Sequence, residues 1–161
     1  MDEIIQKRRE EYGKGKWLVF KDIQVGMEFP TVAFEVTGEL IEKYCRAMGD
    51  AQALYSDEKA ARKEGYERTI APATIVCIYA IPSALLSGYV PKVIPPPGNI
   101  HFRQEYEFFS PAGAGDTIRI NSKVVAKEVR KQRYYVTIES EYINQTGKKI
   151  AVGRITPIWS R

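Results

Sequence analysis

The residues best suited to chemistry lie in one short stretch, residues 49–57, with the sequence GDAQALYSD. A carboxylate, Asp50, directly follows a glycine, and Gln52 and Tyr55 come two and five residues later. A carboxylate can take up or release the proton of a water molecule, and a neutral amide can orient water or a carbonyl compound. The spacing therefore indicates proton-transfer chemistry on water, with a phenol at the position where a base would be expected.

A second candidate group is the start of an apolar segment, Ala71-Pro72-Ala73-Thr74. Adding water across an activated double bond, or removing it, needs donors for the enolate-like oxygen on a thioester carbonyl. Backbone N–H groups at the start of a buried helix are unpaired and carry partial positive charge. Because Pro72 has no N–H, we expect Ala73 and Thr74 to be the donors.

The acidic loop follows a predicted helix. Thr37 is the expected N-cap, and Glu39 lies in the first turn, where the helix dipole favours a negative charge. Apolar residues then share one helical face, at Leu40, Ile41, Tyr44, Cys45 and Met48. Gly49 is the expected C-terminal stop, so Asp50 begins its loop at the end of a packed helix.

Two further helices follow in the sequence. Ser56 is the expected cap of a short one that ends at Gly65. Residues 70–86 are apolar nearly all round, which predicts a helix buried on every side. Pro72 suits its first turn, whereas Pro82 should kink or end the straight part.

Alternation with a period of two predicts the strands. One strand covers residues 32–36, and after a proline-rich linker at 90–98 a meander of four antiparallel strands is expected. These four strands cover residues 100–108, 118–124, 134–142 and 149–158, with turns at 115–116 and 144–147. A twisted antiparallel sheet wrapped around one apolar helix is an α+β arrangement, the hot-dog fold.

The composition fits a single domain over residues 1–161, with residues 1–16 as a charged arm or short helix. With 44% hydrophobic and 27% charged residues, a disordered chain is excluded. The net charge of +4 is too mild to select a nucleic acid, and no nucleic-acid motif is present. The densest basic run, residues 127–133, is interpreted as a solvated hairpin end.

The two cysteines, Cys45 and Cys77, are expected to be buried free thiols. A Cys/His zinc set is impossible with one histidine, so no metal and no cofactor are expected. No apolar run approaches the roughly 20 residues of a membrane span, and the mixed-charge start lacks a signal-peptide core. We therefore expect a cytoplasmic protein that does not contact a membrane.

The stretch from 49 to 74 resembles the MaoC-like family of (R)-specific enoyl-CoA hydratases and 3-hydroxyacyl dehydratases. The family loop has the form G-D-x-N-P-x-H-x-D and is followed by a helix start, I-A-H-G; this chain has GDAQALYSD and then IAPA. Asp50 matches the catalytic aspartate, and Gln52 occupies the asparagine position. Tyr55 replaces the catalytic histidine, and Ala73 occupies the glycine position whose N–H helps to form the oxyanion hole.

One branch of that family is more similar still. Residues 65–74 have the form G-Y-x-x-x-I-A-P-x-T, and G-D-T-I at 115–118 and N-Q-T-G at 144–147 also match this branch. It comprises the N-terminal domains of MaoC-like dehydratases and the subunits of heterodimeric acyl dehydratases, and the resemblance covers residues 20–158. It implies an acyl-CoA thioester substrate, a role in fatty acid metabolism, and a homodimer or a heterodimer with a catalytic MaoC-like subunit.

The tyrosine at position 55 is the important departure from the family. The ordinary pKa of a phenol is near 10, whereas histidine titrates near 6.5, so Tyr55 is a poor proton acceptor at neutral pH. General-base assistance is typically worth about 10²–10⁴-fold. In the heterodimers of this branch one subunit keeps the Asp/His pair while the other lines the acyl channel. The resemblance implies that this chain is the second kind of subunit.

Other interpretations stay open at this stage. The chain can be a self-sufficient hydratase that uses Asp50 alone or with His101, or a non-catalytic acyl-CoA-binding protein. Asp50 can be a simple loop acid, Tyr55 a half-buried aromatic, and His101 a structural or surface residue. Arg103 and the pair Lys148-Lys149 either contact CoA phosphates or are solvated. A thioesterase is a further hot-dog activity, but no acid is placed on the central helix to serve it.

Overall fold

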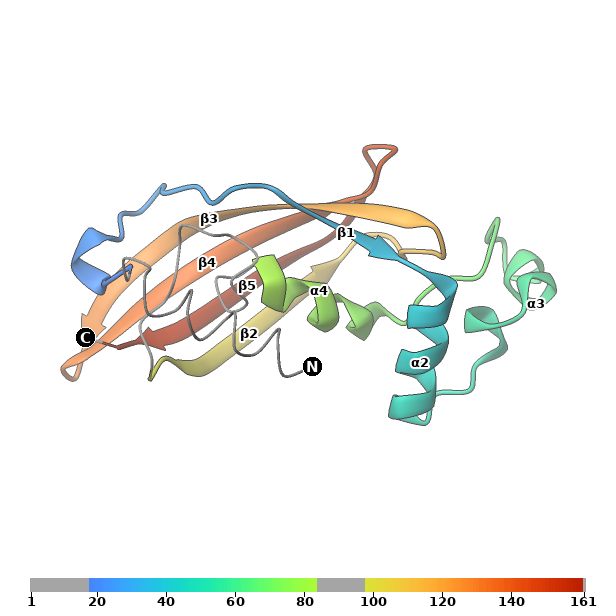
Figure 1. Cartoon of the computed structure of the whole chain (residues 1–161), viewed down its shortest axis with the longest axis horizontal. Helices are drawn as coiled ribbons and strands as arrows, with labels where there is room; N and C mark the ends of the chain where they lie inside the picture. Colours follow the sequence, from blue (N-terminus) through green and yellow to red (C-terminus); the bar gives the residue numbers. More distant parts are fainter. Residues whose placement is uncertain (1–17, 84–97, 161) are drawn as a thin grey trace, which may run out of the picture.

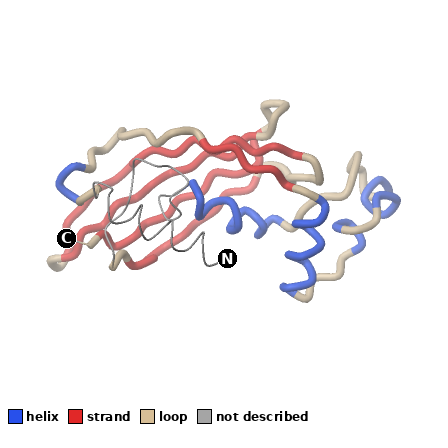
Figure 2. The backbone as a smooth tube through the Cα atoms, viewed as in Figure 1, coloured by secondary structure: helices blue, strands red, loops and turns tan. Residues whose placement is uncertain are grey.

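The computed structural model describes residues 18–83 and 98–160. A five-stranded antiparallel sheet forms the body of the molecule, and α4 (Val76–Ser83) lies against one of its faces (Figure 1). Helices α2 (Gly38–Met48) and α3 (Glu58–Lys63) lie beyond one end of the sheet (Figure 2). The strands are β1 (Val32–Val36), β2 (Ile100–Phe108), β3 (Asp116–Arg130), β4 (Arg133–Ile143) and β5 (Lys149–Trp159). This is the predicted α+β arrangement of a sheet around a central helix.

The strand order is β1-β3-β4-β5-β2, which corrects the prediction of a four-strand meander. Strands β3, β4 and β5 do follow one another, but β2 lies beyond β5 instead of beside β3. Tyr106 of β2 pairs with Gly153 of β5. A Cβ atom at position 153 would lie 2.6 Å from Cε1 of the Tyr106 ring, so the glycine makes room for the tyrosine. Strands β1 and β2 are the two edges of the sheet.

Helix α2 has the predicted ends. The Thr37 side chain accepts a hydrogen bond from the Leu40 N–H at 3.1 Å, and Glu39 lies in the first turn. Gly49 adopts the left-handed conformation with φ 67°, which favours glycine. The next amide, of Asp50, donates to the Cys45 carbonyl at 3.0 Å. The backbone at the start of the acidic loop is therefore fixed by the end of the helix.

The cap of α3 differs from the prediction. Asp57, and not Ser56, is the N-cap, and its carboxylate accepts a hydrogen bond from the Lys59 N–H at 2.8 Å. Ser56 instead follows the 3-10 turn η2 (Ala53–Tyr55), and its N–H donates to the Ala53 carbonyl at 3.1 Å. Both residue types make good caps, and the preceding turn decides which one is in position.

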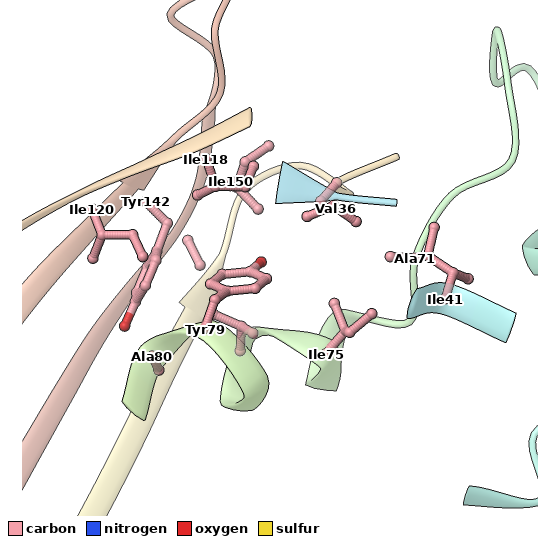
Figure 3. Close-up of a cluster of buried hydrophobic side chains, with 13 residues drawn as sticks. Val36, Ile41, Ala71, Ile75, Tyr79, Ala80, Ile118, Ile120, Tyr142 and Ile150 are labelled. Carbon is pink, nitrogen blue, oxygen red and sulfur yellow. The ribbon is translucent and has the colours of Figure 1, made fainter. Parts of the chain in front are cut away.

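The central helix begins later and is less covered than predicted. It begins with the 3-10 turn η3 (Ala73–Ile75), and Pro72 is the N-cap of that turn rather than part of it. Ile78 of α4 is 41% exposed, because the sheet of one chain covers only one flank of the helix. The opposite flank contributes Ile75, Val76, Tyr79 and Ala80 to the main hydrophobic core. Figure 3 shows Ile75 and Tyr79 projecting from the helix toward the strands.

A second, smaller part of the core lies around Trp159 at the far end of the sheet. The indole N–H of Trp159 donates to the Leu18 carbonyl at 2.8 Å. The basic run 127–133 does contain a hairpin end, because Lys131 and Gln132 form the β3–β4 turn with positive φ values. The predicted turn at 144–147 is also present, with the Gly147 N–H donating to the Asn144 carbonyl at 3.0 Å.

Several predictions concern residues outside the described ranges: the arm at 1–16, residues 84–86 of the central helix and residues 90–97 of the linker. Within residues 18–83 and 98–160, no helix has the length and apolar character that crossing a membrane requires. Cys45 and Cys77 are free thiols, as predicted, but both are half-buried.

The buried carboxylate of Asp116 links the segment that precedes the central helix to the segment that precedes β3. Asp116 is 1% exposed. Its oxygens accept from Arg68 Nη2 at 2.5 Å, the Gly113 N–H at 2.7 Å and Asn144 Nδ2 at 3.3 Å. Arg68 also donates to the Ala114 carbonyl at 2.7 Å. The chain that enters the central helix is thereby joined to the segment that precedes β3.

Replacing Asp116 by alanine should lower the free energy of unfolding by about 2–3 kcal/mol. The change leaves the buried Gly113 N–H without its acceptor, a loss of roughly 1–3 kcal/mol, and removes the partner of Arg68. Denaturant unfolding followed by circular dichroism measures this. Glu42→Ala, which breaks an exposed ion pair on α2, is the control and should change stability by less than about 0.5 kcal/mol. Equal effects of the two substitutions would contradict the structural role of Asp116.

Candidate functional site

An apolar hollow of about 400 Å³ opens beside the start of the central helix. It lies between η3, the acidic loop and the segment that follows β2. The residues that define its walls are Tyr55, Ala73, Ile75, Tyr79, Phe108, Phe109 and Ile150. Its size is at the small end of the roughly 300–1,000 Å³ typical of small-molecule sites.

The predicted donor Ala73 lies in the wall of this apolar hollow. The next bonded amide of the turn is that of Ile75, which donates to the Pro72 carbonyl at 2.9 Å, and the Ala71 N–H donates to the Ala112 carbonyl at 2.8 Å. The N–H of Ala73 makes no hydrogen bond to any other described residue. An unpaired amide at a helix start, exposed in an apolar hollow, can donate to an oxyanion.

The second predicted donor, Thr74, is placed less favourably. Its N–H also makes no hydrogen bond within the part of the chain that the structure describes. However, Thr74 is exposed and lines neither this hollow nor the smaller one next to Asp50.

A smaller hollow of about 320 Å³, here called the Asp50 hollow, lies between the end of α2 and the acidic loop. Asp50, Gln52 and Tyr55 all line it, together with residues at the end of α2. The structure therefore brings the three predicted residues of the loop together. Gln52 is exposed, and it belongs to the Asp50 hollow and not to the apolar hollow that contains Ala73.

Tyr55 belongs to both parts of the candidate site, because this residue lines both hollows. The loop and the helix start are also joined through the backbone, since the Ile70 N–H donates to the Leu54 carbonyl at 3.1 Å. Tyr55 is thus the residue that the hollow lined by Ala73 shares with the hollow lined by Asp50.

The half-buried carboxylate of Asp50 accepts no hydrogen bond from the other described residues. Its charge acts on two neighbours. Burial raises the pKa of Tyr55, and the negative charge of Asp50 raises it further, with smaller contributions from Cys45 and Tyr66. Burial and the Asp50 charge likewise raise the pKa of the Cys45 thiol. At neutral pH the phenol is therefore a neutral hydrogen-bond donor and cannot act as a base.

The single histidine does not take part in this site. His101 is exposed on β2, pairs with Pro157, and lines neither hollow. Among residues 18–83 and 98–160, no group of three or more His, Cys, Asp or Glu side chains is arranged to hold a metal ion.

Sequence reasoning missed the far wall of the apolar hollow. Phe108 is the last residue of β2, Phe109 follows it directly, and Ile150 comes from β5. In the sequence these residues are marked only by their apolar character, and this does not predict which other element they pack against. Arg68 was also missed, although it lies five residues before Ala73 and fixes that segment through Asp116.

The fold and the family match identify a hydratase/dehydratase-like protein of the MaoC-like class. Residues 23–152 match the family described as "FAS1-like, dehydratase domain region", and the chain therefore belongs to this family. A UPF0336 protein of a Parafrankia species is 30% identical over 128 residues, which cover 76% of this chain and 82% of the relative. The resemblance to the MaoC-like family is thereby confirmed.

Solved structures confirm the hot-dog fold. A MaoC-like dehydratase from Rhodospirillum rubrum has a TM-score of 0.74 at 23% identity, covering 89% of this chain and 98% of its own. The HadBC complex from Mycobacterium tuberculosis, a (3R)-hydroxyacyl-ACP dehydratase, has a TM-score of 0.71 at 24% identity, covering 83% and 96%. Identities this low show the fold alone.

The contact between Asp50 and Tyr55 can be tested by titration. Asp50→Asn should lower the pKa of Tyr55, because the negative charge that disfavours the phenolate is removed. The pKa should stay above its ordinary value of about 10, because burial is the larger cause. NMR of ring-labelled tyrosine, with the Tyr55 signal assigned from Tyr55→Phe, measures the shift.

Asp57→Asn is the matched control, since this carboxylate caps α3 and does not contribute to the pKa shift of Tyr55. It should leave the Tyr55 titration unchanged. An unchanged titration in Asp50→Asn would mean that the carboxylate and the phenol do not face each other.

Proposed function

We propose that this chain is a subunit of an acyl-thioester hydratase/dehydratase, which adds water to an enoyl-CoA or removes it from a 3-hydroxyacyl-CoA. The observation that carries the proposal is the unpaired Ala73 amide in the wall of the apolar hollow, which shares Tyr55 with the hollow that Asp50 lines. Membership of a dehydratase-region family supports the same reaction class.

In the proposed reaction, the thioester carbonyl lies against the start of the central helix and its acyl chain enters the apolar hollow. As water attacks the double bond, negative charge develops on the carbonyl oxygen. The Ala73 N–H donates to that oxygen and lowers the barrier. Loss of one oxyanion donor typically lowers the rate by about 10²–10³-fold, so this single amide is a substantial part of catalysis.

The attacking water must also lose a proton. Asp50 can accept a hydrogen bond from water and Gln52 can orient it, but the neutral Tyr55 phenol cannot accept the proton. Since His101 is exposed and lines neither hollow, this chain lacks a histidine at its own site. We therefore propose that a MaoC-like partner supplies the Asp/His pair, and that this chain contributes the acyl-binding surface.

The edge strand β2 is a suitable surface for that partner. Among the strands described, it is paired on one side only, with β5. Ile100, Phe102 and Phe108 are large apolar side chains on it, and each is about half exposed. An unpaired edge with exposed apolar residues favours pairing with another chain. The HadBC structure, which has a similar fold, is itself a complex of two chains.

A co-expression experiment tests the partnership. With a MaoC-like protein that carries the histidine, the pair should hydrate crotonyl-CoA, as followed by the loss of absorbance of the enoyl thioester. Each chain alone should be slower by about 10²-fold or more, because each would lack a part of the site. Activity that is unchanged when this chain is omitted would contradict the proposal. Full activity of this chain alone, lost in Asp50→Asn, would instead indicate a self-sufficient enzyme.

The role of the amide can be tested by removing it without removing the turn. Ala73→Pro deletes the N–H, and proline is tolerated at the first position of a helical turn. The preceding residue, Pro72, already has an extended ψ of 137°, as a residue before proline requires. We expect kcat/KM of the complex to fall by about 10²–10³-fold.

Ala73→Gly is the matched control, because it changes the side chain and keeps the donor. It should retain activity within about tenfold of the wild type, since an added glycine costs roughly 1 kcal/mol in a helix. If both variants lose activity equally, the amide is not the oxyanion donor.

A further inference from the structure

The apolar hollow ends at an aromatic floor. Tyr79 lines it with only 1% of its surface exposed, whereas Ala73 is exposed, so the hollow runs inward from Ala73 toward Tyr79. Ala73, Ile75 and Tyr79 follow one another along the central helix, from the mouth of the hollow to its floor. In Figure 3 the Tyr79 ring occupies the space between α4 and the strands, next to Ile150.

Further aromatic rings hold this floor in place. The Tyr79 ring lies 5.3 Å from that of Phe34 and 5.7 Å from that of Tyr142, centroid to centroid. The Tyr106 ring lies 6.4 Å from that of Tyr142, over Gly153. Burial raises the pKa of Tyr79, so its hydroxyl stays neutral at physiological pH. A close-packed row of rings gives way to an added chain only at a substantial cost.

A thioester bound at Ala73 therefore has limited depth for its acyl chain. We propose that Tyr79 limits the length of the acyl chain and that the substrate is a short-chain acyl thioester, such as a crotonyl one. This inference rests on the proposed function and adds the substrate class. Once the hollow is filled down to Tyr79, each further methylene must displace a packed ring or remain in water.

The test compares the binding of butyryl-CoA, decanoyl-CoA and CoA itself, because saturated thioesters are not hydrated. Calorimetric titration uses the full-length protein, alone and together with its MaoC-like partner. For the wild type we expect butyryl-CoA to bind at least tenfold more tightly than CoA, and decanoyl-CoA to gain no more than about threefold over butyryl-CoA. In Tyr79→Ala the gain of decanoyl-CoA over butyryl-CoA should reach tenfold or more, since one methylene in an apolar pocket is worth about 10–200-fold.

Two further variants separate chain-length control from a loss of folding. Tyr79→Leu removes the ring but keeps an apolar side chain, and it should show the same change of preference if Tyr79→Ala does not fold. Tyr135→Ala removes another buried tyrosine, which lies on β4 and does not line the hollow. It should lose stability and keep the wild-type preference. Thermal unfolding of each variant confirms that a folded protein is measured.

The outcomes distinguish this inference from the proposed function. A wild type that already gains tenfold from butyryl-CoA to decanoyl-CoA, or a preference that neither Tyr79 variant changes, overturns the role of Tyr79 and leaves the proposed function intact. If neither thioester binds more tightly than CoA, with or without the partner, the proposed function fails and the inference fails with it.

Discussion

The rest of the structure depends on one constraint. The segment that enters the central helix is bonded to the segment that precedes β3. The Ala71 N–H donates to the Ala112 carbonyl, and the carboxylate of Asp116 binds Arg68 and the Gly113 N–H. This short antiparallel bridge ends at Ala71, and Pro72 has no N–H to continue it. The next amide, that of Ala73, is therefore left unpaired by the fold itself. The ion pair between Arg68, five residues before Ala73, and the buried carboxylate of Asp116 keeps this amide beside the apolar hollow.

The electrostatics of the acidic loop explain how Asp50 and Tyr55 can be held together and still lack a general base. Burial and the charge of Asp50 both favour the neutral form of Tyr55, so the two side chains form a donor and an acceptor with no base between them. An imidazole at the same position would titrate near pH 6.5 and could exchange protons with water. Loss of one oxyanion donor typically costs about 10²–10³-fold, and general-base assistance is worth about 10²–10⁴-fold. In the proposed function, this chain supplies the group for the first alone.

The elements that carry the site were predicted from local signals in the sequence, such as helix caps and turns. The features that were not predicted depend on pairing between residues far apart in the chain. The cap at Thr37, the left-handed Gly49 and the loop that begins at Asp50 follow from neighbouring residues, and all are found. The position of β2 beyond β5 depends on the fit of Tyr106 over Gly153, which periodicity along one strand does not contain. The same holds for Phe108 and Ile150, which form the far wall of the hollow from two different strands. The choice of Asp57 over Ser56 as a cap depended on a 3-10 turn that no apolar pattern signals.

The most informative disagreement concerns burial of the central helix. Its sequence is apolar on every side, yet Ile78 is 41% exposed in the single chain. An apolar side chain that stays exposed to water adds no hydrophobic stabilisation, whereas burial of such a side chain stabilises the protein by about 1.5–3 kcal/mol. The exposed flank of α4 and the half-exposed Phe102 and Phe108 on the unpaired edge of β2 are explained together if a second chain covers them. The apolar sequence of the helix is that expected of a helix covered in an assembly, and in the proposed function the covering chain is also the one that supplies the histidine.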